Sequence, residues 1–277
     1  MLAAMHQCPK AGLLRCIRQG FVAVGCLSVA ACSVVMQRDG PGGALDAENI
    51  ADAVPRSEPR SRYGNPDSYE VLGRHYHTLK SSNGFRQRGI ASWYGKKFHG
   101  RKTSSGEIYD MYQMTAAHKI LPLPTYVKVR NLENGRSAIL KVNDRGPFHE
   151  NRIIDLSYAA ALKLGITTKG TAFVEVTALN NGSTFRVLAD EPAQRSSEAV
   201  FGLYLQIGAF NERHNAQRLS QHVTSHLLKN VRIREASRGN KSIYRVQVGP
   251  IATVELADRL VNMLVALGIS DHHFVSD

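Results

Sequence analysis

Short runs in which apolar and polar residues alternate dominate the middle of the chain. This period of two is typical of short β-strands with one buried face. Four such runs, each rich in β-branched residues, are residues 90–94, 125–131, 137–142 and 172–179. The Glu-Asn-Gly sequence at residues 133–135 predicts a tight hairpin turn between the second and third runs. One helical segment, residues 155–165, ends in glycine, so we expect a small closed barrel with one short helix.

The C-terminal part of the chain has a different rhythm. Its order of strand, helix, strand, strand, helix and strand predicts a ferredoxin-like fold, in which two helices cover one face of a four-stranded sheet. The second helix is the clearest, because four leucines and a methionine recur on one face at helical spacing. The expected strands are residues 203–210, 231–236, 242–248 and 273–275, and the expected helices are residues 212–228 and 254–267.

The first 32 residues combine three basic residues with an apolar run and contain no acidic residue. This is the layout of a secretory signal, and the apolar run is too short for a stable transmembrane helix. All four cysteines lie here, at positions 8, 16, 26 and 32, which excludes a disulfide or a cysteine metal site in the folded part.

Residues 29–32, Val-Ala-Ala-Cys, resemble a bacterial lipoprotein box, in which Cys32 would become the lipidated first residue. Cys26 is a weaker candidate, and an ordinary signal peptide with a chance cysteine is the alternative. Ser33 follows Cys32. By resemblance to lipoprotein sorting rules, the absence of aspartate at that position implies the outer membrane.

Composition divides the rest of the chain. Stretches rich in Gly, Pro, Ser and charged residues, without an apolar period, predict a disordered tether before the barrel and a linker after it. The expected organisation is a signal peptide at 1–31, a tether at 32–67, a barrel domain at 68–180, a linker at 181–199 and a C-terminal domain at 200–277.

The formal net charge of +12 favours an anionic partner. Nucleic acid, lipid headgroups and acidic polymers are the candidate classes. The C-terminal pattern is also that of an RNA-recognition module, but the aromatic strings of such modules are missing and the signal peptide removes the chain from the cytoplasm. We therefore exclude nucleic acid as a partner.

Candidate chemistry is concentrated in four short motifs of the barrel. They are GIASWYG at residues 89–95, TSSGE at 103–107, AAH at 116–118 and VNDRGP at 142–147. Two carboxylates and an imidazole are thereby set among turn-forming residues. Carboxyl groups can protonate a glycosidic oxygen and stabilise an oxocarbenium-like transition state, so the combination indicates sugar chemistry. Since the sequence has no metal-ligand cluster, phosphate-binding loop or Ser-His-Asp arrangement, we expect no metal and no cofactor.

These motifs, with Ile-Asp-Leu-Ser at residues 154–157, resemble the double-psi β-barrel of the rare lipoprotein A family of septal lytic transglycosylases. Residues 203–276 resemble a SPOR domain, through YLQIGAF at 204–210 and YRVQVGP at 244–250. The resemblance implies a mainly β plus α+β chain, with a six-stranded double-psi β-barrel followed by a ferredoxin-like βαββαβ SPOR domain. SPOR domains bind peptidoglycan glycan strands that have lost their stem peptides.

The resemblance also implies a mechanism. In a lytic transglycosylase the C6 hydroxyl of muramic acid attacks the anomeric carbon and gives a 1,6-anhydro end, so one residue can serve first as acid and then as base. The catalytic pair of the family and its nearby histidine fall on Glu107, Asp144 and His118. We expect Asp144 to be the acid and base, and Glu107 to orient the sugar or stabilise positive charge.

Other interpretations of these residues stay open. Asp144 is alternatively a turn-capping residue, Glu107 a solvated loop carboxylate, and His118 a structural residue of a barrel turn. Trp93 is expected in the core and Tyr94 in the groove. The substrate-binding residues expected in the barrel are Tyr94, Ser105, Asn143 and Arg145. The basic residues between positions 96 and 102 are either a solvated face or an attractor for the lactyl carboxylates of muramic acid.

In the C-terminal domain, residues two apart on a strand share a face. We therefore expect Leu205, Ile207 and Ala209 to face the helices. The alternate residues are expected to form a polar and aromatic face, and they are Tyr204, Gln206, Gly208 and Phe210. That face is the candidate glycan surface, and a plain exposed sheet face is the alternative. The expected glycan-binding residues are Gln206, Phe210, Tyr244, Arg245 and Gln247.

The sequence thus predicts an endolytic lytic transglycosylase that cleaves MurNAc-GlcNAc β-1,4 bonds of peptide-free septal glycan and aids daughter-cell separation. We expect a lipoprotein anchored through Cys32 at the periplasmic face of the outer membrane, enriched at the division septum. Its partners would be peptidoglycan, the membrane and divisome proteins. The alternative is a non-catalytic, expansin-like protein that binds or loosens the wall without cutting it.

Overall fold

The computed structural model describes residues 40, 43, 45–149, 151–179, 202–226, 230–238 and 241–276. The signal peptide expected at 1–31, the lipidation site expected at Cys32 and the linker expected at 181–199 lie outside these residues. In the part of the chain that the structure describes, no helix has the length and apolar character needed to cross a membrane.

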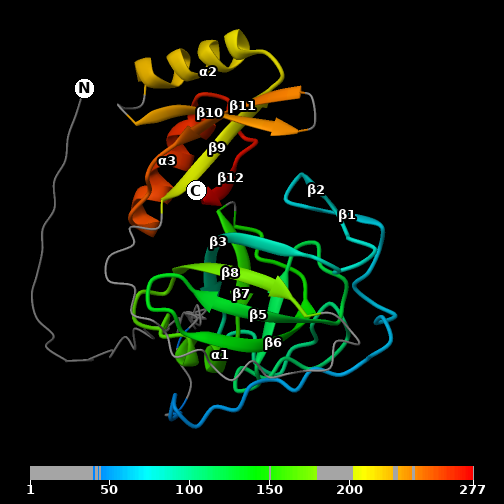
Figure 1. Ribbon diagram of the computed structural model, residues 1–277. Helices are drawn as coiled ribbons and strands as arrows, with labels where there is room; N and C mark the ends of the chain where they lie inside the picture. The colour runs from blue at the N-terminus through cyan, green and yellow to red at the C-terminus, as the bar shows by residue number, and fades with distance from the viewer. Residues whose placement is uncertain are drawn as a thin grey trace, which may run out of the picture. The chain divides into compact units, whose positions relative to one another are not determined.

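Six strands close into a barrel in the order β3-β7-β4-β6-β5-β8 (Figure 1). The β3–β7 and β4–β6 pairs are parallel, and the other pairs are antiparallel. This closed arrangement confirms the predicted six-stranded barrel. The strands are β3 (Arg86–Trp93), β4 (Thr115–His118), β5 (Thr125–Asn131), β6 (Ser137–Asp144), β7 (Arg152–Leu156) and β8 (Ala172–Ala178).

Alternation along the strands fills the barrel interior with apolar side chains. Val127 and Val129 of β5 and Leu140 and Val142 of β6 are completely buried. The predicted hairpin turn joins these two strands, which pair antiparallel. Gly135 adopts a φ of 76° in that turn, a conformation that glycine reaches without steric cost.

Strands β4 and β7 are two elements that the sequence pattern does not indicate. The segment expected to be helical begins inside β7, because Asp155 and Leu156 pair with both β3 and β4. Helix α1 (Tyr158–Lys163) begins only after Ser157, whose hydroxyl accepts a hydrogen bond from the N–H of Ala160 (3.2 Å). Pairing with strands distant in the sequence therefore overrides local helix propensity here.

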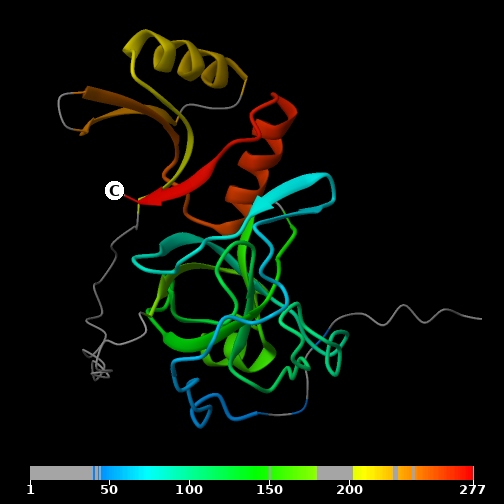
Figure 2. The ribbon, with the colours of Figure 1, turned by 90° about the vertical axis from the view of Figure 1, so that its right-hand side faces the viewer.

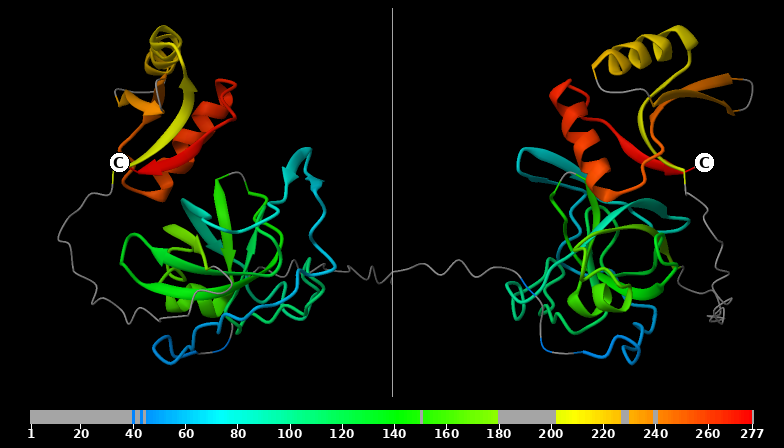
Figure 3. Two further views of the ribbon diagram at one scale, coloured as in Figure 1. Left: turned by 45° about the vertical axis from the view of Figure 1, so that its right-hand side comes forward. Right: turned by 90° about the vertical axis from the view of Figure 1, so that its left-hand side faces the viewer.

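Residues 45–66, here called the strap, run in extended form along the outside of the barrel (Figure 3). The N–H of Ala53 donates to the carbonyl of Ile139 (3.0 Å), and the N–H of Ser61 donates to the carbonyl of Leu123 (2.8 Å). Composition predicts a disordered tether here, whereas this part of the tether is ordered on the barrel. Because every residue but proline has a backbone N–H group, hydrogen bonds from the backbone to the barrel cannot be predicted from composition. A hairpin of β1 (Ser68–Val71) and β2 (Arg74–His77) follows.

The C-terminal domain has the predicted order of elements, with an antiparallel sheet in the order β10-β11-β9-β12 (Figure 2). This is the strand order of a ferredoxin-like fold. Both helices contribute to its core, through Ala216 and Val223 of the first and Leu260 and Leu264 of the second. The elements are β9 (Leu203–Phe210), α2 (Arg213–His226), β10 (Val231–Arg238), β11 (Lys241–Val248), α3 (Val254–Ala266) and β12 (His273–Ser276).

An irregularity in β9 changes which side chains share a face. Gln206 pairs with Gln247 and Gly208 with Val246, so Ile207 is an extra residue in the ladder. Such a bulge shifts the alternation by one position. Phe210 therefore packs on the domain core, while Ala209 is exposed. The predicted grouping of Phe210 with Gln206, and of Ala209 with the helix-facing residues, is wrong for this reason.

Candidate active site

The C-terminal end of strand β6 carries a bulge next to strand β4. Ala116 pairs with Val142 and Ala117 with Asp144, so Asn143 has no partner in the β4 register. Bulges re-aim side chains and are frequent beside active sites. This one places Asp144 at the very end of β6 and turns Asn143 toward a neighbouring loop.

Three donors fix one oxygen of the Asp144 carboxylate. Oδ1 accepts hydrogen bonds from the N–H of Ser104 (2.7 Å), from the hydroxyl of Ser104 (2.6 Å) and from the N–H of Arg145 (2.7 Å). Among the described residues no donor reaches Oδ2 of Asp144. The carboxylate is therefore held in one orientation, with Oδ2 outside this set of hydrogen bonds.

The loop of residues 103–107 is closed on itself and docked on β6. The N–H of Thr103 donates to the carbonyl of Glu107 (2.8 Å), and the N–H of Gly106 donates to the carbonyl of Thr103 (2.9 Å). Gly106 has a φ of 92°, which a residue with a Cβ rarely adopts. The N–H of Ser105 donates to the carbonyl of Asn143 (3.3 Å). The hydrogen bonds of this loop thus bring the TSSGE and VNDRGP motifs together.

Glu107 is fixed by two residues of β6. Its Oε1 lies 2.8 Å from the Lys141 ammonium, and its Oε2 accepts a hydrogen bond from the Asn143 amide (2.7 Å). Lys141 and Asn143 are two positions apart on the strand and reach the same side. The Glu107 side chain remains 45% exposed, so a ligand can approach it.

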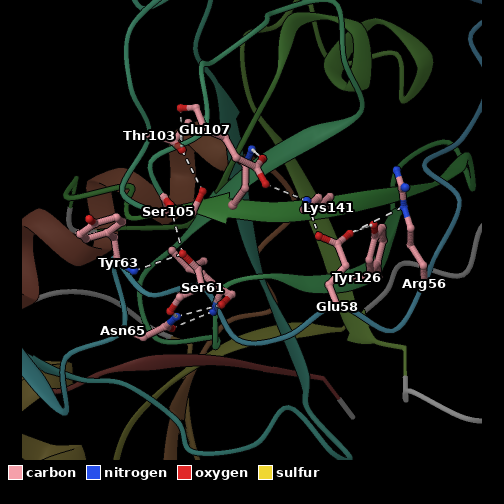
Figure 4. Close-up of polar contacts among 12 residues, drawn as sticks. Arg56, Glu58, Ser61, Tyr63, Asn65, Thr103, Ser105, Glu107, Tyr126 and Lys141 are labelled. Carbon is pink, nitrogen blue, oxygen red and sulfur yellow. Dashed lines mark hydrogen bonds and ion pairs between the residues drawn. The ribbon is translucent and has the colours of Figure 1, made fainter.

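Lys141 also pairs with a residue of the strap (Figure 4). Its ammonium lies 2.8 Å from Oε2 of Glu58, and the Tyr126 hydroxyl donates to Oε1 of Glu58 (2.5 Å). Burial lowers the pKa of Lys141, but its hydrogen bonds to Glu107 and Glu58 raise it above its ordinary value overall. Burial raises the pKa of Glu58, and the bonds from Lys141 and Tyr126 outweigh this and lower it.

His118 lies in the barrel interior, and its ring nitrogens bond groups other than the two carboxylates. It is 1% exposed, and its Nδ1 accepts hydrogen bonds from the N–H groups of Ile120 and Leu121, both 3.2 Å. Nε2 therefore carries the ring proton and donates to Oε1 of Gln87 (3.1 Å). Burial, with the nearby positive charges of Arg145 and Lys119, lowers the pKa of His118 to about 3. The ring is neutral at physiological pH and shapes the turn that follows β4.

The Arg145 guanidinium is directed into the same turn. It donates to the carbonyls of His118 (3.1 Å) and Leu121 (2.6 Å), and to the carbonyl of Gly64 (2.8 Å) and the amide oxygen of Asn65 (3.1 Å) in the strap. Its side chain is thus engaged by the protein rather than presented to a substrate. Only its backbone N–H contacts Asp144.

Tyr94 is part of the core rather than of a groove. It is 8% exposed and stacks on Tyr109 with ring centroids 4.2 Å apart. Burial raises the pKa of Tyr94 well above its ordinary value, and the charges of Asp144 and Asp155 add to this. Trp93 packs against the two core clusters of the barrel, as the sequence predicts. The expectation that Tyr94 lines the groove is therefore not met.

A second carboxylate lies in the barrel wall beside Asp144. Ala117 of β4 pairs with Asp144 on one side and with Asp155 on the other, and Asp155 pairs with Ser92 of β3. Paired residues point to the same face, so the row Ser92, Asp155, Ala117 and Asp144 crosses four strands. The Ser92 hydroxyl donates to Asp155. Burial raises the pKa of Asp155, although this hydrogen bond opposes the shift.

Three residues of the site have no strong signal in the sequence. Ser104 rather than Ser105 contacts Asp144, whereas the Ser105 hydroxyl bonds Thr103 (3.0 Å). Two adjacent serines in one motif cannot be told apart without the loop geometry. Lys141 shows only as the residue before the VNDRGP motif. Glu58 lies in a stretch whose composition predicts disorder.

Basic side chains cover the loop after β3. They are Lys96, Lys97, Arg101 and Lys102, and all are exposed. Lys97 and Arg101 lie over the Phe98 ring, 5.7 and 5.9 Å from its centroid. In the described residues no group of three or more His, Cys, Asp or Glu side chains could hold a metal ion.

The expected glycan-binding residues of the C-terminal sheet divide into two groups. Gln206 and Gln247 are paired and buried (7% and 1% exposed), and Gln247 accepts a hydrogen bond from Arg232 (3.0 Å). The Arg232 guanidinium stacks 3.3 Å from the centroid of the Tyr204 ring. Tyr244 pairs with Phe210 and packs with it on the core, whereas Arg245 is exposed.

Two family models match the chain in the regions of its two folded domains. A family described as "Lytic transglycolase" matches residues 86–176, and the family described as "SPOR domain" matches residues 199–275. The first match runs from β3 into β8 and includes Glu107 and Asp144, whereas the strap lies outside it.

Relatives extend over most of the chain. A Vibrio cholerae serotype O1 protein named "Endolytic peptidoglycan transglycosylase RlpA" is 39% identical over 247 residues, which are 89% of this chain and 90% of that protein. A Neisseria meningitidis serogroup A protein of the same name is 42% identical over 213 residues, 75% of this chain and 82% of that protein. A solved SPOR domain of RlpA from Pseudomonas aeruginosa is 27% identical and covers 27% of this chain and 97% of that structure, with a TM-score of 0.26.

Proposed function

The chain belongs to the family of endolytic peptidoglycan transglycosylases named RlpA, and on that premise we propose that its barrel cleaves the MurNAc-GlcNAc β-1,4 bonds of peptide-free glycan. One observation carries the proposal. The 103–107 loop holds the Asp144 carboxylate through Ser104 and presents Glu107 from its other end. Two carboxylates of different surroundings beside one loop can supply a proton donor and a stabiliser of positive charge for glycosidic cleavage.

We assign proton transfer to Asp144. Protonated at Oδ2, it donates its proton to the glycosidic oxygen as the bond from that oxygen to the anomeric carbon of MurNAc breaks. The C6 hydroxyl of the same sugar then attacks that carbon, and its proton passes to the Asp144 carboxylate. The product has a 1,6-anhydro end, water is not consumed, and the acid is regenerated.

We assign electrostatic stabilisation to Glu107. Positive charge develops at the anomeric carbon and ring oxygen in the transition state, and a fixed carboxylate near it lowers the barrier. Asn143 and Lys141 hold the Glu107 carboxylate in place. His118 and Arg145 would act by shaping the turn and the strap around the site, since their side chains are engaged within the protein.

The C-terminal domain supplies the second half of the proposal. A SPOR domain that binds peptide-free glycan would bring the barrel to its substrate at the division septum. In the sheet, the exposed Arg245 remains the residue that we propose for glycan binding, and the buried pair Gln206 and Gln247 would support the sheet beneath it. Phe210 and Tyr244 would support that sheet from its core side.

We also propose a lipid anchor at Cys32, retained at the periplasmic face of the outer membrane. The supporting observations are the small-residue box before Cys32 and the serine after it. The full-length protein should fractionate with membranes, and the Cys32→Ser variant should appear in the soluble fraction. Continued membrane association of that variant would contradict lipidation at Cys32.

The test of the activity is the chemistry of the product. Peptide-free glycan is incubated with the protein, and its ends are identified by mass spectrometry. Internal fragments with 1,6-anhydroMurNAc ends are expected from wild type. Binding of glycan without such ends would favour the non-cutting, expansin-like alternative, and reducing ends without the anhydro bond would show a hydrolase.

A further inference from the structure

The strap reaches the 103–107 loop as well as the barrel. The Ser61 hydroxyl donates to the carbonyl of Ser105 (3.0 Å). At Gly64 a Cβ would lie 2.6 Å from the carbonyl oxygen of Ser104, so only glycine permits this approach. Together with the Arg145 bonds to Gly64 and Asn65, these contacts join the strap to both parts of the site. The strap therefore borders the site, in addition to connecting the barrel to the N-terminal part of the chain.

One lysine serves two carboxylates at this border (Figure 4). Lys141 lies 2.8 Å from Glu107 and 2.8 Å from Glu58, and its side chain is only 17% exposed. The one ammonium is shared between the two carboxylates, and the Arg56 guanidinium lies 3.8 Å from Oε1 of Glu58 as a second cation. Glu58 thus restrains the lysine as a second partner beside Glu107, and the Tyr126 hydroxyl restrains Glu58.

We propose that Lys141 and Glu58 are positioning residues for Glu107, so that the strap is a functional part of the active site. This inference rests on the proposed function. Lys141 fixes Glu107 beside the developing positive charge, and Glu58 holds Lys141 in the position from which it bonds Glu107.

Substitutions of Lys141 and Glu58 test the inference through kcat. Lys141→Met should lower kcat roughly tenfold or more, because a small displacement of a charged group is costly in a transition state, while KM changes little. Lys141→Arg should recover part of the loss, because a guanidinium can also bond two carboxylates. Glu58→Gln, which keeps the shape of the side chain, should lower kcat several-fold. Lys169→Met is the matched control, since Lys169 forms an exposed ion pair with Glu133 (2.7 Å) elsewhere on the barrel.

A spectroscopic reading separates this inference from the proposed function. In protein carrying 13C-labelled lysine, Glu58→Gln and Glu107→Gln should each lower the pKa of Lys141, because the two carboxylates together raise it. If wild type yields no anhydro ends but the pKa of Lys141 falls in both variants, the proposed activity fails and the charge network stands. If Lys141→Met and Glu58→Gln keep the kcat of wild type, the positioning role is overturned.

A second observation on the strap points to substrate recognition. Tyr63 is 59% exposed, and its ring lies against Gly106, with Cδ2 3.4 Å from the position of a Cβ there. The N–H of Tyr63 donates to the Ser61 hydroxyl (3.2 Å). Because that hydroxyl bonds the 103–107 loop, Tyr63 is held beside the loop. The Arg62 guanidinium lies 5.7 Å from the centroid of the ring. An exposed aromatic ring and a cation thus stand together at the edge of the site.

The geometry points to Arg62 and Tyr63 as a subsite for a muramic acid unit of peptide-free glycan. The Tyr63 ring would stack on the pyranose, and Arg62 would pair with the lactyl carboxylate. That carboxylate is charged only after the stem peptide is removed, because in intact strands it forms an amide. Arg62 would therefore favour peptide-free strands, which deepens the proposed function.

Two substrates test this subsite. Arg62→Gln should lower kcat/KM on peptide-free glycan several-fold and leave the rate on peptide-bearing glycan unchanged, so that the ratio of the two falls. Arg130→Gln, which alters an exposed arginine of β5, is the control and should not change the ratio. An unchanged ratio for Arg62→Gln in an enzyme that cleaves normally would overturn the subsite, whereas absence of cleavage by wild type would instead overturn the proposed function.

Discussion

Two polar regions flank the end of strand β6 and use their hydrogen bonds in opposite ways. In the first, the 103–107 loop with Lys141, Asn143 and Asp144, the bonds hold two carboxylates whose remaining surface faces outward. In the second, the turn at residues 118–121 with the side chain of Arg145, these hydrogen bonds join groups of the protein to one another. Both regions contain motif residues, so membership of a motif does not separate chemistry from architecture. The two regions differ instead in the partners of their hydrogen bonds and in the exposure of their side chains.

The largest expected effect breaks the first region and spares the fold. Asp144→Asn should reduce the rate of cleavage roughly 10³-fold, since it removes the general acid that we propose. The amide can still accept the hydrogen bonds of Ser104 and Arg145, so the midpoint of thermal unfolding should stay within about 2 °C of wild type. Rate and unfolding are measured on the same preparation. Retained cleavage would move the acid to another residue, with Glu107 as the first candidate.

The second prediction breaks the buried turn instead. Arg145→Met should destabilise the barrel by about 3 kcal/mol, because buried carbonyl groups of the turn and the strap lose their donor. Urea unfolding of the barrel measures the loss. Arg86→Met is the control, because Arg86 is 61% exposed and its partner Glu175 keeps a second ion pair, with Arg88 (2.5 Å), so little stability should be lost. Equal losses in the two variants would contradict the role given to Arg145.

The third prediction uses pH to separate the regions. The pKa of His118 is lowered from 6.5 to about 3 in the folded protein. Below pH 6.5 the unfolded chain binds a proton that the folded one does not, so the stability that neutral His118 contributes falls as pH drops toward 3. Between pH 7 and pH 4 the wild-type barrel should lose roughly 3 kcal/mol more than His118→Asn, whose amide oxygen can replace Nδ1 as acceptor. Parallel urea titrations at the two pH values test this, and identical losses would contradict it.

Part of the fold and part of the site can be predicted from the sequence. The six-stranded barrel and the ferredoxin-like domain follow from alternation and motif resemblance, whereas the sequence does not say how close the two motif carboxylates come. The roles of His118 and Tyr94 do not follow from it either, because nothing local shows that a ring will be buried. Glu58 escapes notice because its segment is ordered only by hydrogen bonds to the barrel, and Phe210 changes face because a single bulge residue, Ile207, is invisible in the pattern.

The smallest expected effect concerns Asp155, which shares the row of Asp144 and is partly buried in the barrel wall. Burial raises its pKa, so the folded protein holds a proton that the unfolded chain loses as pH rises above 3.8. Its contribution to stability therefore falls with rising pH through that window. Asp155→Asn should raise the midpoint of thermal unfolding at pH 7 by about 2 to 4 °C, and the gain should vanish near pH 3. A constant gain at both pH values would contradict this interpretation.

The most direct test of the contrast between the two regions is the yield of 1,6-anhydroMurNAc ends per folded molecule in Asp144→Asn and His118→Asn, measured side by side on peptide-free glycan. We predict that Asp144→Asn forms almost none, while His118→Asn, corrected for its folded fraction, stays within about tenfold of wild type, because a positioning residue costs less than a general acid. Equal loss of product in both variants would place His118 in the chemistry and contradict the division between an outward site and a buried turn.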